Sequence, residues 1–270
     1  TVFFWFFTGA MLRPVEESRK KQARFVAAAS HELRTPLAVI LSSASCLLEI
    51  LNEEKSPACA EPSNTDGAAN TREASLRRFL DAIFSESRRM NHLVQDMLQL
   101  AGMDARAPRL HLKPVPLDTL LLDVCEKYEP LAAKKGIRLT VSLPDAPLPD
   151  CLCDQERILQ SLAVLMDNAL SYTPAGGMVR LALTVANRHF TITVSDTGPG
   201  IPDKDKKAVF ERFYRAESSR SDKAHYGLGL SIAQDIIKQH GGRLTVTDAP
   251  EGGAAFVLEL PMNCNQKNIL

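Results

Sequence analysis

Residues 25–37 read FVAAASHELRTPL, which places one histidine beside an acid, a threonine one turn later and a proline directly after the threonine. Apolar residues recur along this part of the chain at steps of three and four, which is typical of a helix with one buried seam. They are Val26, Ala29, Leu33, Leu37, Ile40, Ala44, Leu47 and Leu51. The pattern predicts a helix from near Pro14 or Val15 to about Leu51.

His31 lies off this seam. It follows Ala29 by two residues, which is about 200° around a helix of 3.6 residues per turn, so we expect its side chain to face solvent. Glu32 is adjacent, and Thr35 lies one turn later on the same face as His31. Pro36 removes the amide that would bond to the carbonyl of Glu32, which predicts a bend. An exposed histidine with these neighbours is a candidate nucleophile.

A second apolar seam follows at helical spacing and predicts a partner helix. Its members are Leu76, Phe79, Ile83, Met90, Leu93, Met97 and Leu100. Residues 52–71 between the two seams are rich in Ser, Pro, Asn, Ala and Gly, which indicates a loop. The two helices would form a hairpin, and two hairpins packed as a four-helix bundle would bury both seams. We therefore expect a homodimer.

The motif SHELRTPL resembles the phosphoacceptor box of sensor histidine kinases, and the resemblance extends from about Arg13 to Pro261. It implies that His31 accepts phosphate and that Glu32 acts as its general base. It further implies that Thr35 positions a water that hydrolyses a phosphorylated response regulator. The partner would be the receiver domain of that regulator.

Length and composition limit the number of domains and the classes of partner. The chain has 270 residues, which is room for about two domains, and 45% of them are hydrophobic. Its formal net charge of zero argues against a nucleic-acid partner, because no broad basic field is available to bind phosphates of a duplex. Beyond one Cys-x-Cys, the six cysteines lack the spacing of zinc sites, so reduced cytosolic thiols are expected.

Residues 1–12 are uncharged and contain five aromatic side chains, and several basic residues follow from Arg13. This composition predicts the end of a truncated transmembrane helix. Twelve helical residues cover about 18 Å, and a hydrocarbon core is about 30 Å thick. The basic flank predicts that all later residues are cytoplasmic, so we expect a bacterial inner (cell) membrane location. Alternatives are an aromatic core helix or a remnant of a secretory signal, although a signal carries its positive charge before the apolar run.

The predicted hairpin occupies residues 13–103, a proline-rich linker follows over 104–116, and a second domain spans 117–262 before a tail at 263–270. Helices and strands are segregated in the second domain, which predicts an α+β sandwich. The expected helices are 117–135, 154–172 and 228–240. The expected strands are 137–143, 178–186, 189–196, 243–247 and 255–260.

The predicted helix 154–172 contains LMDNALSYTP, which resembles the N box of the ATP-binding domain of the same family, a fold of the Bergerat or GHKL type. The resemblance makes Asn168 the ligand of Mg²⁺, and an amide oxygen is a hard donor that suits this ion. Two positions depart from the family pattern. Val164 stands where another Asn is common, and Ser171 stands where a Lys is common.

Residues 195–200, SDTGPG, follow a predicted strand and match the first glycine box of the family, DxGxG. The resemblance implies that Asp196 accepts the amino group of adenine. Gly198 and Gly200 would let the backbone approach the base closely. The resemblance also implies that Ile201 is a nucleotide-binding residue.

Further motifs appear in the family's order. Phe210, Phe213 and Tyr214 resemble its F box, which implies that Phe210 contacts the nucleotide. Arg215 would contact either the phosphates or the phosphoacceptor helix. Residues 218–226 are polar and aperiodic, which predicts a mobile lid. The residues Gly227, Leu228, Gly229 and Leu230 open a helix and match the second half of the second glycine box, where backbone amides would face phosphate oxygens.

The nucleotide-binding region differs from the family pattern in its second glycine box, and it contains no P-loop motif. Ala224 and His225 stand where the first half of the second glycine box usually has glycines. Gly252 and Gly253 resemble a third glycine box that shapes the pocket floor. The sequence GxxxxGK[ST] is absent, which excludes an ordinary P-loop.

These motifs predict a protein-histidine kinase that transfers the γ-phosphoryl group of Mg-ATP to His31 and then to an aspartate of a regulator. A second hypothesis is another ATPase of the same superfamily, resembling chaperone or mismatch-repair ATPases. A third is a degenerate kinase that acts as a dimeric scaffold, which Val164 and Ser171 would favour.

Overall fold

The computed structural model describes residues 2–53, 65–105, 110–215 and 226–262. It divides into two compact units, Thr1–Met97 and Leu98–Leu270. Each unit is described by itself below.

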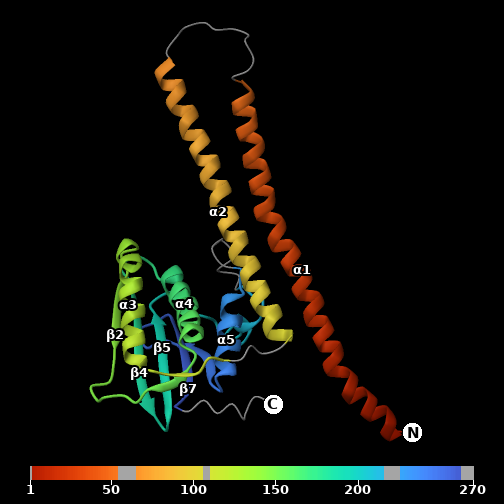
Figure 1. Ribbon diagram of the computed structural model, residues 1–270, viewed down its shortest axis with the longest axis vertical. Helices are drawn as coiled ribbons and strands as arrows, with labels where there is room; N and C mark the ends of the chain where they lie inside the picture. The colour runs from red at the N-terminus through yellow and green to blue at the C-terminus, as the bar shows by residue number, and fades with distance from the viewer. Residues whose placement is uncertain (1, 54–64, 106–109, 216–225, 263–270) are drawn as a thin grey trace. The chain divides into compact units, whose positions relative to one another are not determined.

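The first unit is built from two long helices, α1 (Val2–Glu53) and α2 (Thr65–Ala105), the second of which runs on past Met97. The helices lie side by side as a hairpin (Figure 1). The prediction that the first helix begins near Pro14 is wrong, because α1 begins at Val2 and continues through Pro14 and Pro36. A proline inside a helix removes one backbone hydrogen bond without necessarily ending the helix, so Pro14 does not mark the start of α1.

The predicted loop over 52–71 is also too long. Helix α1 includes residues up to Glu53, and α2 begins at Thr65. Ala68 and Ala69 are strong helix formers in the first turns of α2, and this signal is masked by the polar residues and glycine beside them. Residues 54–64 lie outside the described part of the chain.

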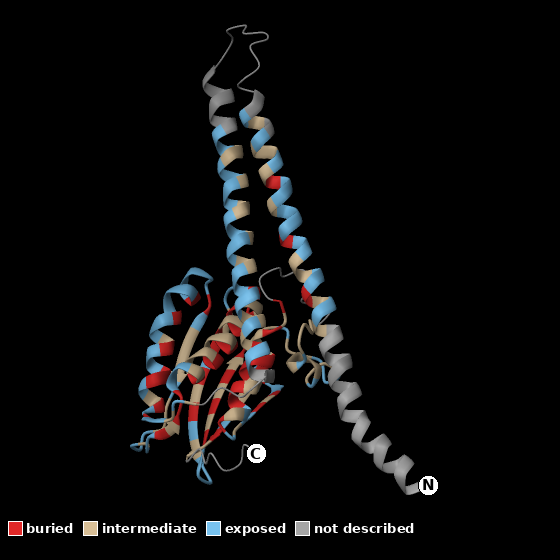
Figure 2. Ribbon diagram, turned by 45° about the vertical axis from the view of Figure 1, so that its right-hand side comes forward, coloured by how far each residue is buried: buried red, intermediate tan, exposed pale blue. Residues whose placement is uncertain are grey.

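The predicted seam of α2 is confirmed, because all seven of its members are buried or half-buried. The seam of α1 is confirmed only in part. Ala29 is buried and Leu33 is half-buried, whereas Val26, Leu37 and Leu51 are 56%, 47% and 47% exposed in the single chain. The apolar surface of α1 is thus wider than one partner helix covers, and Figure 2 shows much of the hairpin exposed.

The second unit contains a five-stranded sheet with the strand order β2-β4-β5-β7-β6. Its strands are β2 (Arg138–Ser142), β4 (Met178–Ala186), β5 (His189–Asp196), β6 (Arg243–Asp248) and β7 (Ala254–Pro261). β2 and β4 pair in parallel, and the other pairs are antiparallel. Asn187 and Arg188 join β4 to β5 with φ of 51° and 63°, as a two-residue hairpin turn requires.

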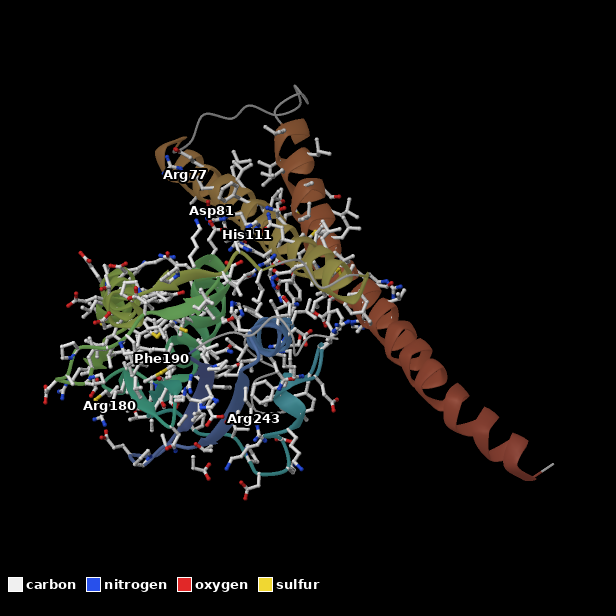
Figure 3. The ribbon with its side chains drawn as sticks, turned by 60° about the horizontal axis from the view of Figure 1, so that its bottom comes forward. Arg77, Asp81, His111, Arg180, Phe190 and Arg243 are labelled. Atoms are coloured by element: carbon white, nitrogen blue, oxygen red, sulfur yellow. The ribbon has the colours of Figure 1, made fainter. Side chains whose placement is uncertain are left out.

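Three helices cover one face of this sheet, and they are α3 (Leu117–Lys134), α4 (Gln155–Tyr172) and α5 (Gly229–Gln239) (Figure 1). Alternate residues of β5 are buried beneath them, among them Phe190, which is labelled in Figure 3. Arg180 and Arg243 of the same sheet are exposed at its periphery. One buried and one solvated face is the usual state of an antiparallel sheet.

The predicted helical hairpin and α+β sandwich are therefore confirmed, and all eight helices and strands expected in the second domain are present. Short elements were missed. They are β1 (Lys113–Val115), which pairs with β3 (Cys151–Cys153), and a single 3-10 turn, η1 (Ala208–Phe210). β1 lies inside the stretch 104–116 that the sequence predicts as a linker, so this part of the stretch is paired within the second unit.

Candidate phosphoacceptor and nucleotide sites

The first candidate site is the turn of α1 that contains His31. The His31 side chain is exposed, as predicted, and Thr35 one turn later is exposed as well. Glu32 is half-buried and Pro36 is buried, so they lie nearer the α2 side of the helix. The turn thus presents an imidazole and a hydroxyl to solvent on one face, with a carboxylate at its edge.

The second candidate site lies at the end of β5. Asp196 is only 6% exposed, and its Oδ1 accepts hydrogen bonds from the backbone N–H of Gly198 (2.8 Å) and of Ala254 (3.3 Å). Burial raises the pKa of the Asp196 carboxyl, and the two backbone donors oppose this shift. Oδ2 has no hydrogen-bond partner among the described residues. Asp196 is therefore a fixed acceptor with one oxygen still available.

Glycines surround this carboxylate because no side chain would fit. A Cβ atom at Gly253, where φ is +89°, would lie 2.0 Å from the Asp196 carbonyl oxygen. A Cβ at Gly198 would lie 2.7 Å from the carbonyl oxygen of Tyr172. The end of β5, the end of α4 and the turn before β7 thus meet at backbone distance, as the glycine boxes predict.

Asn168 lies in the last part of α4 and is half-buried. The helix is capped at its other end by Asp154, whose Oδ1 accepts from Arg157 N. The Tyr128 hydroxyl of α3 donates to the carbonyl of Ala163 at 3.3 Å and also bonds Asp167, the neighbour of Asn168. Burial, and next the nearby Asp167, raise the pKa of Tyr128. Sequence reasoning missed this tyrosine, because a lone Tyr on an apolar helix carries no signal.

The departure at Val164 has a structural counterpart. A Cβ atom at Gly229 would lie 3.0 Å from Val164 Cγ1, so the valine side chain occupies the space that the glycine leaves open. The first turn of α5 thereby approaches the middle of α4. Leu228 is buried, with 1% of the residue exposed, while Leu230 and Ile201 are half-buried.

The predicted F box packs against the start of the second glycine box. Phe210 contacts Phe256 edge to face, with ring centroids 6.4 Å apart. Phe213 adopts φ of +63°, and its N–H donates to the carbonyl of Gly227 at 2.9 Å. A Cβ at Gly227 would lie 2.6 Å from the Tyr214 carbonyl oxygen, so this crossing also requires a glycine.

The structure gives fewer contacts for the remaining predicted residues. Gly200 adopts φ of +73° against the Gly253 backbone, and Arg215 is half-buried. Most of the predicted lid, 218–225, lies outside the described residues, together with Ala224 and His225. The donor at Ala254 was not foreseen, although the adjacent Gly252 and Gly253 marked this turn.

Comparison with known proteins identifies the two domains that contain these candidate sites. Residues 21–106 match the His Kinase A (phospho-acceptor) domain, and residues 153–263 match the histidine kinase-, DNA gyrase B-, and HSP90-like ATPase domain. The chain belongs to the sensor histidine kinases. The candidate phosphoacceptor turn lies in the first of these kinase domains and Asp196 in the second.

Individual kinases resemble the chain over most of its length. The sensor histidine kinase RppB of Synechocystis is 32% identical over 259 residues, which cover 96% of this chain and 53% of RppB. Full-length ShkA in complex with AMPPNP superposes with a TM-score of 0.61 at 28% identity, over 88% of this chain and 45% of ShkA. Histidine kinase ThkA in complex with response regulator TrrA shares the fold, with a TM-score of 0.65 at 22% identity over 94% of this chain and 67% of that chain.

The chain spans 24% to 53% of the length of the first curated kinases that it matches. Within the described residues of this kinase chain, no helix is both long and apolar enough to cross a membrane.

Proposed function

We propose that this chain is the kinase portion of a sensor that phosphorylates His31 with Mg-ATP and passes the phosphoryl group to an aspartate of a response regulator. The observation that carries the proposal is the presence, in one chain, of an exposed His31 turn and a buried acceptor, Asp196, enclosed by glycines. The same chain would also dephosphorylate the regulator.

The nucleotide would bind between α4, the end of β5 and the start of α5. The Asp196 carboxylate would accept the adenine amino group through Oδ2, since Oδ1 is held by the backbone. Gly198, Gly200 and Ile201 would contact the base, and Phe210 would lie beside it. Backbone amides from Gly227 to Leu230 would face the phosphates, where the N-terminus of α5 favours negative charge. Arg215 would add a cationic contact.

Mg²⁺ would be held by Asn168. The half-buried Asn168 amide fits a magnesium ion that keeps most of its shell as water and phosphate oxygens. Bound there, the ion would supply neutralisation of the charge that develops on the transferred group. No cluster of three acidic, histidine or cysteine side chains occurs in the described residues, so a magnesium site here has few protein ligands.

At the acceptor, an imidazole nitrogen of His31 would attack the γ-phosphorus while the bond to the bridging oxygen breaks and ADP leaves. Glu32 would orient the ring and take the imidazole proton as general base. In the phosphatase mode, Thr35 would position the water that attacks the aspartyl phosphate of the regulator, which releases inorganic phosphate and the free aspartate. Phosphoryl transfer depends mainly on such positioning and on charge neutralisation.

A homodimer is the proposed assembly, because each hairpin helix has an apolar stripe that faces solvent. On α1 it comprises Val26, Leu37, Leu41, Leu48 and Leu51, and on α2 it comprises Leu80, Phe84, Val94 and Leu98. Each stripe is about 80° wide at 3.6 residues per turn. Such stripes would meet those of a second copy in a four-helix bundle. His31 lies about 120° from the α1 stripe, so the bundle would leave it accessible.

The whole protein would be anchored in a bacterial inner membrane, with both kinase units in the cytoplasm. The aromatic residues 3–7, in an uncharged stretch, and the basic residues from Arg13 onward support this part of the proposal.

The decisive experiment incubates the chain with Mg-ATP carrying a γ-phosphate label and compares it with His31→Gln. Acid-labile, alkali-stable label is expected in the wild type and should be lost in the variant. Label that persists in His31→Gln would overturn the assignment of His31. Rapid release of free phosphate without labelled protein would favour an ATPase of the same superfamily, and AMPPNP binding without any label would favour a scaffold.

A further inference from the structure

His240, at the C-terminal end of α5, is a buried titratable group with no part in the proposed chemistry. It is 1% exposed. Its Nδ1 lies 2.8 Å from the carbonyl oxygen of Ile236, and its Nε2 lies 3.0 Å from the backbone nitrogen of Asp154. Because the Asp154 N–H is a donor, Nε2 must accept, and Nδ1–H must donate to the carbonyl. The hydrogen bonds thus define one neutral tautomer of the imidazole.

Asp154 connects this imidazole to two further segments. Its Oδ1 caps the first turn of α4 by accepting from Arg157 N at 3.3 Å. Its Oδ2 accepts from the backbone N–H of His111 at 3.0 Å, in the segment that leads into β1. One residue therefore joins the end of α5, the start of α4 and the segment that leads into β1.

We propose that His240 and Asp154 form a latch of positioning residues, which holds α4 and α5 together when the imidazole is neutral and opens when it is protonated. Protonation puts a hydrogen on Nε2, where it faces the Asp154 N–H, so the hydrogen bond between the two helices is replaced by a repulsive contact. The start of α4 and the end of α5 are then no longer joined by this bond.

The electrostatic surroundings fit this reading. Burial lowers the pKa of His240, the carbonyl of Ile236 and the charge of Asp154 oppose the shift, and Arg157 in the first turn of α4 reinforces it. The unfolded chain therefore binds a proton more readily than the folded chain does. The stability contributed by the latch is present above the ordinary histidine pKa of about 6.5 and is lost as pH falls below it.

The latch also bears on the nucleotide, a step that rests on the proposed function. α4 carries Asn168, and α5 begins at Gly229, which meets Val164 of α4. The latch holds the start of α4 and the end of α5, which are the ends far from Asn168 and Gly229. It would thereby keep Asn168 and the phosphate-facing amides of α5 in a fixed position relative to each other.

The first test measures hydrogen exchange by mass spectrometry on the full chain between pH 7.5 and 5.5, corrected for the intrinsic pH dependence of exchange. Protection of peptides at the start of α4 and the end of α5 should fall about tenfold in the wild type, relative to peptides of β4 and β5. His240→Gln keeps an acceptor and a donor without titrating, so the same peptides should show no such fall. His189→Gln changes an exposed histidine and should behave as the wild type does. An equal fall in His240→Gln would overturn the latch.

The second test measures AMPPNP affinity with Mg²⁺ at pH 7.5. His240→Leu, which has neither donor nor acceptor, should weaken binding about tenfold, and His240→Gln should restore most of it. Wild-type affinity in His240→Leu would overturn the positioning role. If AMPPNP does not bind the wild type, the proposed nucleotide site fails, while the exchange result still decides the latch.

Discussion

At the residue scale, the Asp196 carboxylate depends on glycines for its position and for access to it. The backbone of the turn before β7 touches the Asp196 backbone directly, and the N–H of Ala254 from this turn bonds Oδ1. A side chain at Gly253 would separate the two strand ends and withdraw this donor. The third glycine box thus acts directly on the carboxylate that we propose binds the base.

Gly252 provides a matched control for this contact. It has φ of +85°, close to the +89° of Gly253, but a Cβ atom at Gly252 would meet nothing within 4 Å. Both changes to alanine carry the cost of a left-handed backbone, about 1 kcal/mol. Gly253→Ala should cost at least about 2 kcal/mol more, and it should weaken AMPPNP binding. Denaturant unfolding and calorimetric titration measure both effects, and equal losses in the two variants would contradict the contact.

Thr35 separates the two proposed activities of the acceptor turn. Its side chain is exposed and lies one turn from His31, where it can hold a water without contacting the imidazole nitrogen. Thr35→Ala should keep autophosphorylation within about twofold and slow dephosphorylation of an accepted regulator at least about tenfold. Phosphate release from a labelled regulator measures this, with the exposed Ser42→Ala as the control. An unchanged hydrolysis rate would count against the role of Thr35.

At the element scale, the approach of α5 to α4 shows how a departure from the family pattern is accommodated. The small Gly229 and the branched Val164 occupy one contact between the helices. Alanine is intrinsically favoured over glycine in helices, so Gly229→Ala at the first residue of α5 would be neutral or slightly stabilising if space allowed. However, the added Cβ atom would lie 3.0 Å from Val164 Cγ1, so the substitution crowds the valine side chain.

A double-mutant cycle tests this contact. Gly229→Ala should destabilise the second unit by about 1 kcal/mol in the presence of Val164, and it should be neutral or stabilising in Val164→Ala. Unfolding of the four proteins gives the coupling energy. Additive effects would show that the two side chains do not compete for space.

The sequence predicted long elements far better than short ones. β4 and β5 agree with their predicted ranges, because alternation over eight or nine residues is a strong signal. β1 and β3 have three residues each, too few for a period, and they are defined only by pairing with each other. Likewise, the DxGxG spacing marked Asp196, but the Ala254 donor and the His240 latch come from residues distant in sequence.

At the scale of the whole molecule, the exposed apolar stripes of the hairpin predict self-association. Phe84 and Leu48 are 65% and 61% exposed in the single chain, which is costly for large apolar side chains unless a partner covers them. The buried residues Ala29 and Pro36 lie about 90° around α1 from the centre of its exposed stripe. Pairing of hairpins would therefore add to the fold of each hairpin without competing with it.

Phe84→Glu should raise the dimer dissociation constant at least about a hundredfold, because it places a charge in an apolar interface. Leu122→Glu is the control, since Leu122 is 47% exposed on α3 of the second unit. Sedimentation equilibrium measures both constants. A wild-type chain that stays monomeric at micromolar concentration would contradict the bundle.

The circumference of α1 divides into sectors, with the α2 contact, the apolar stripe and His31 each facing a different direction. A doubly negative group added at His31 would therefore change the surface charge of the hairpin without passing through its packed faces. Phosphorylation would change only the outer surface of an assembly that stays intact. A diffusing partner could therefore bind and remove the phosphoryl group repeatedly without dissociation of the subunits.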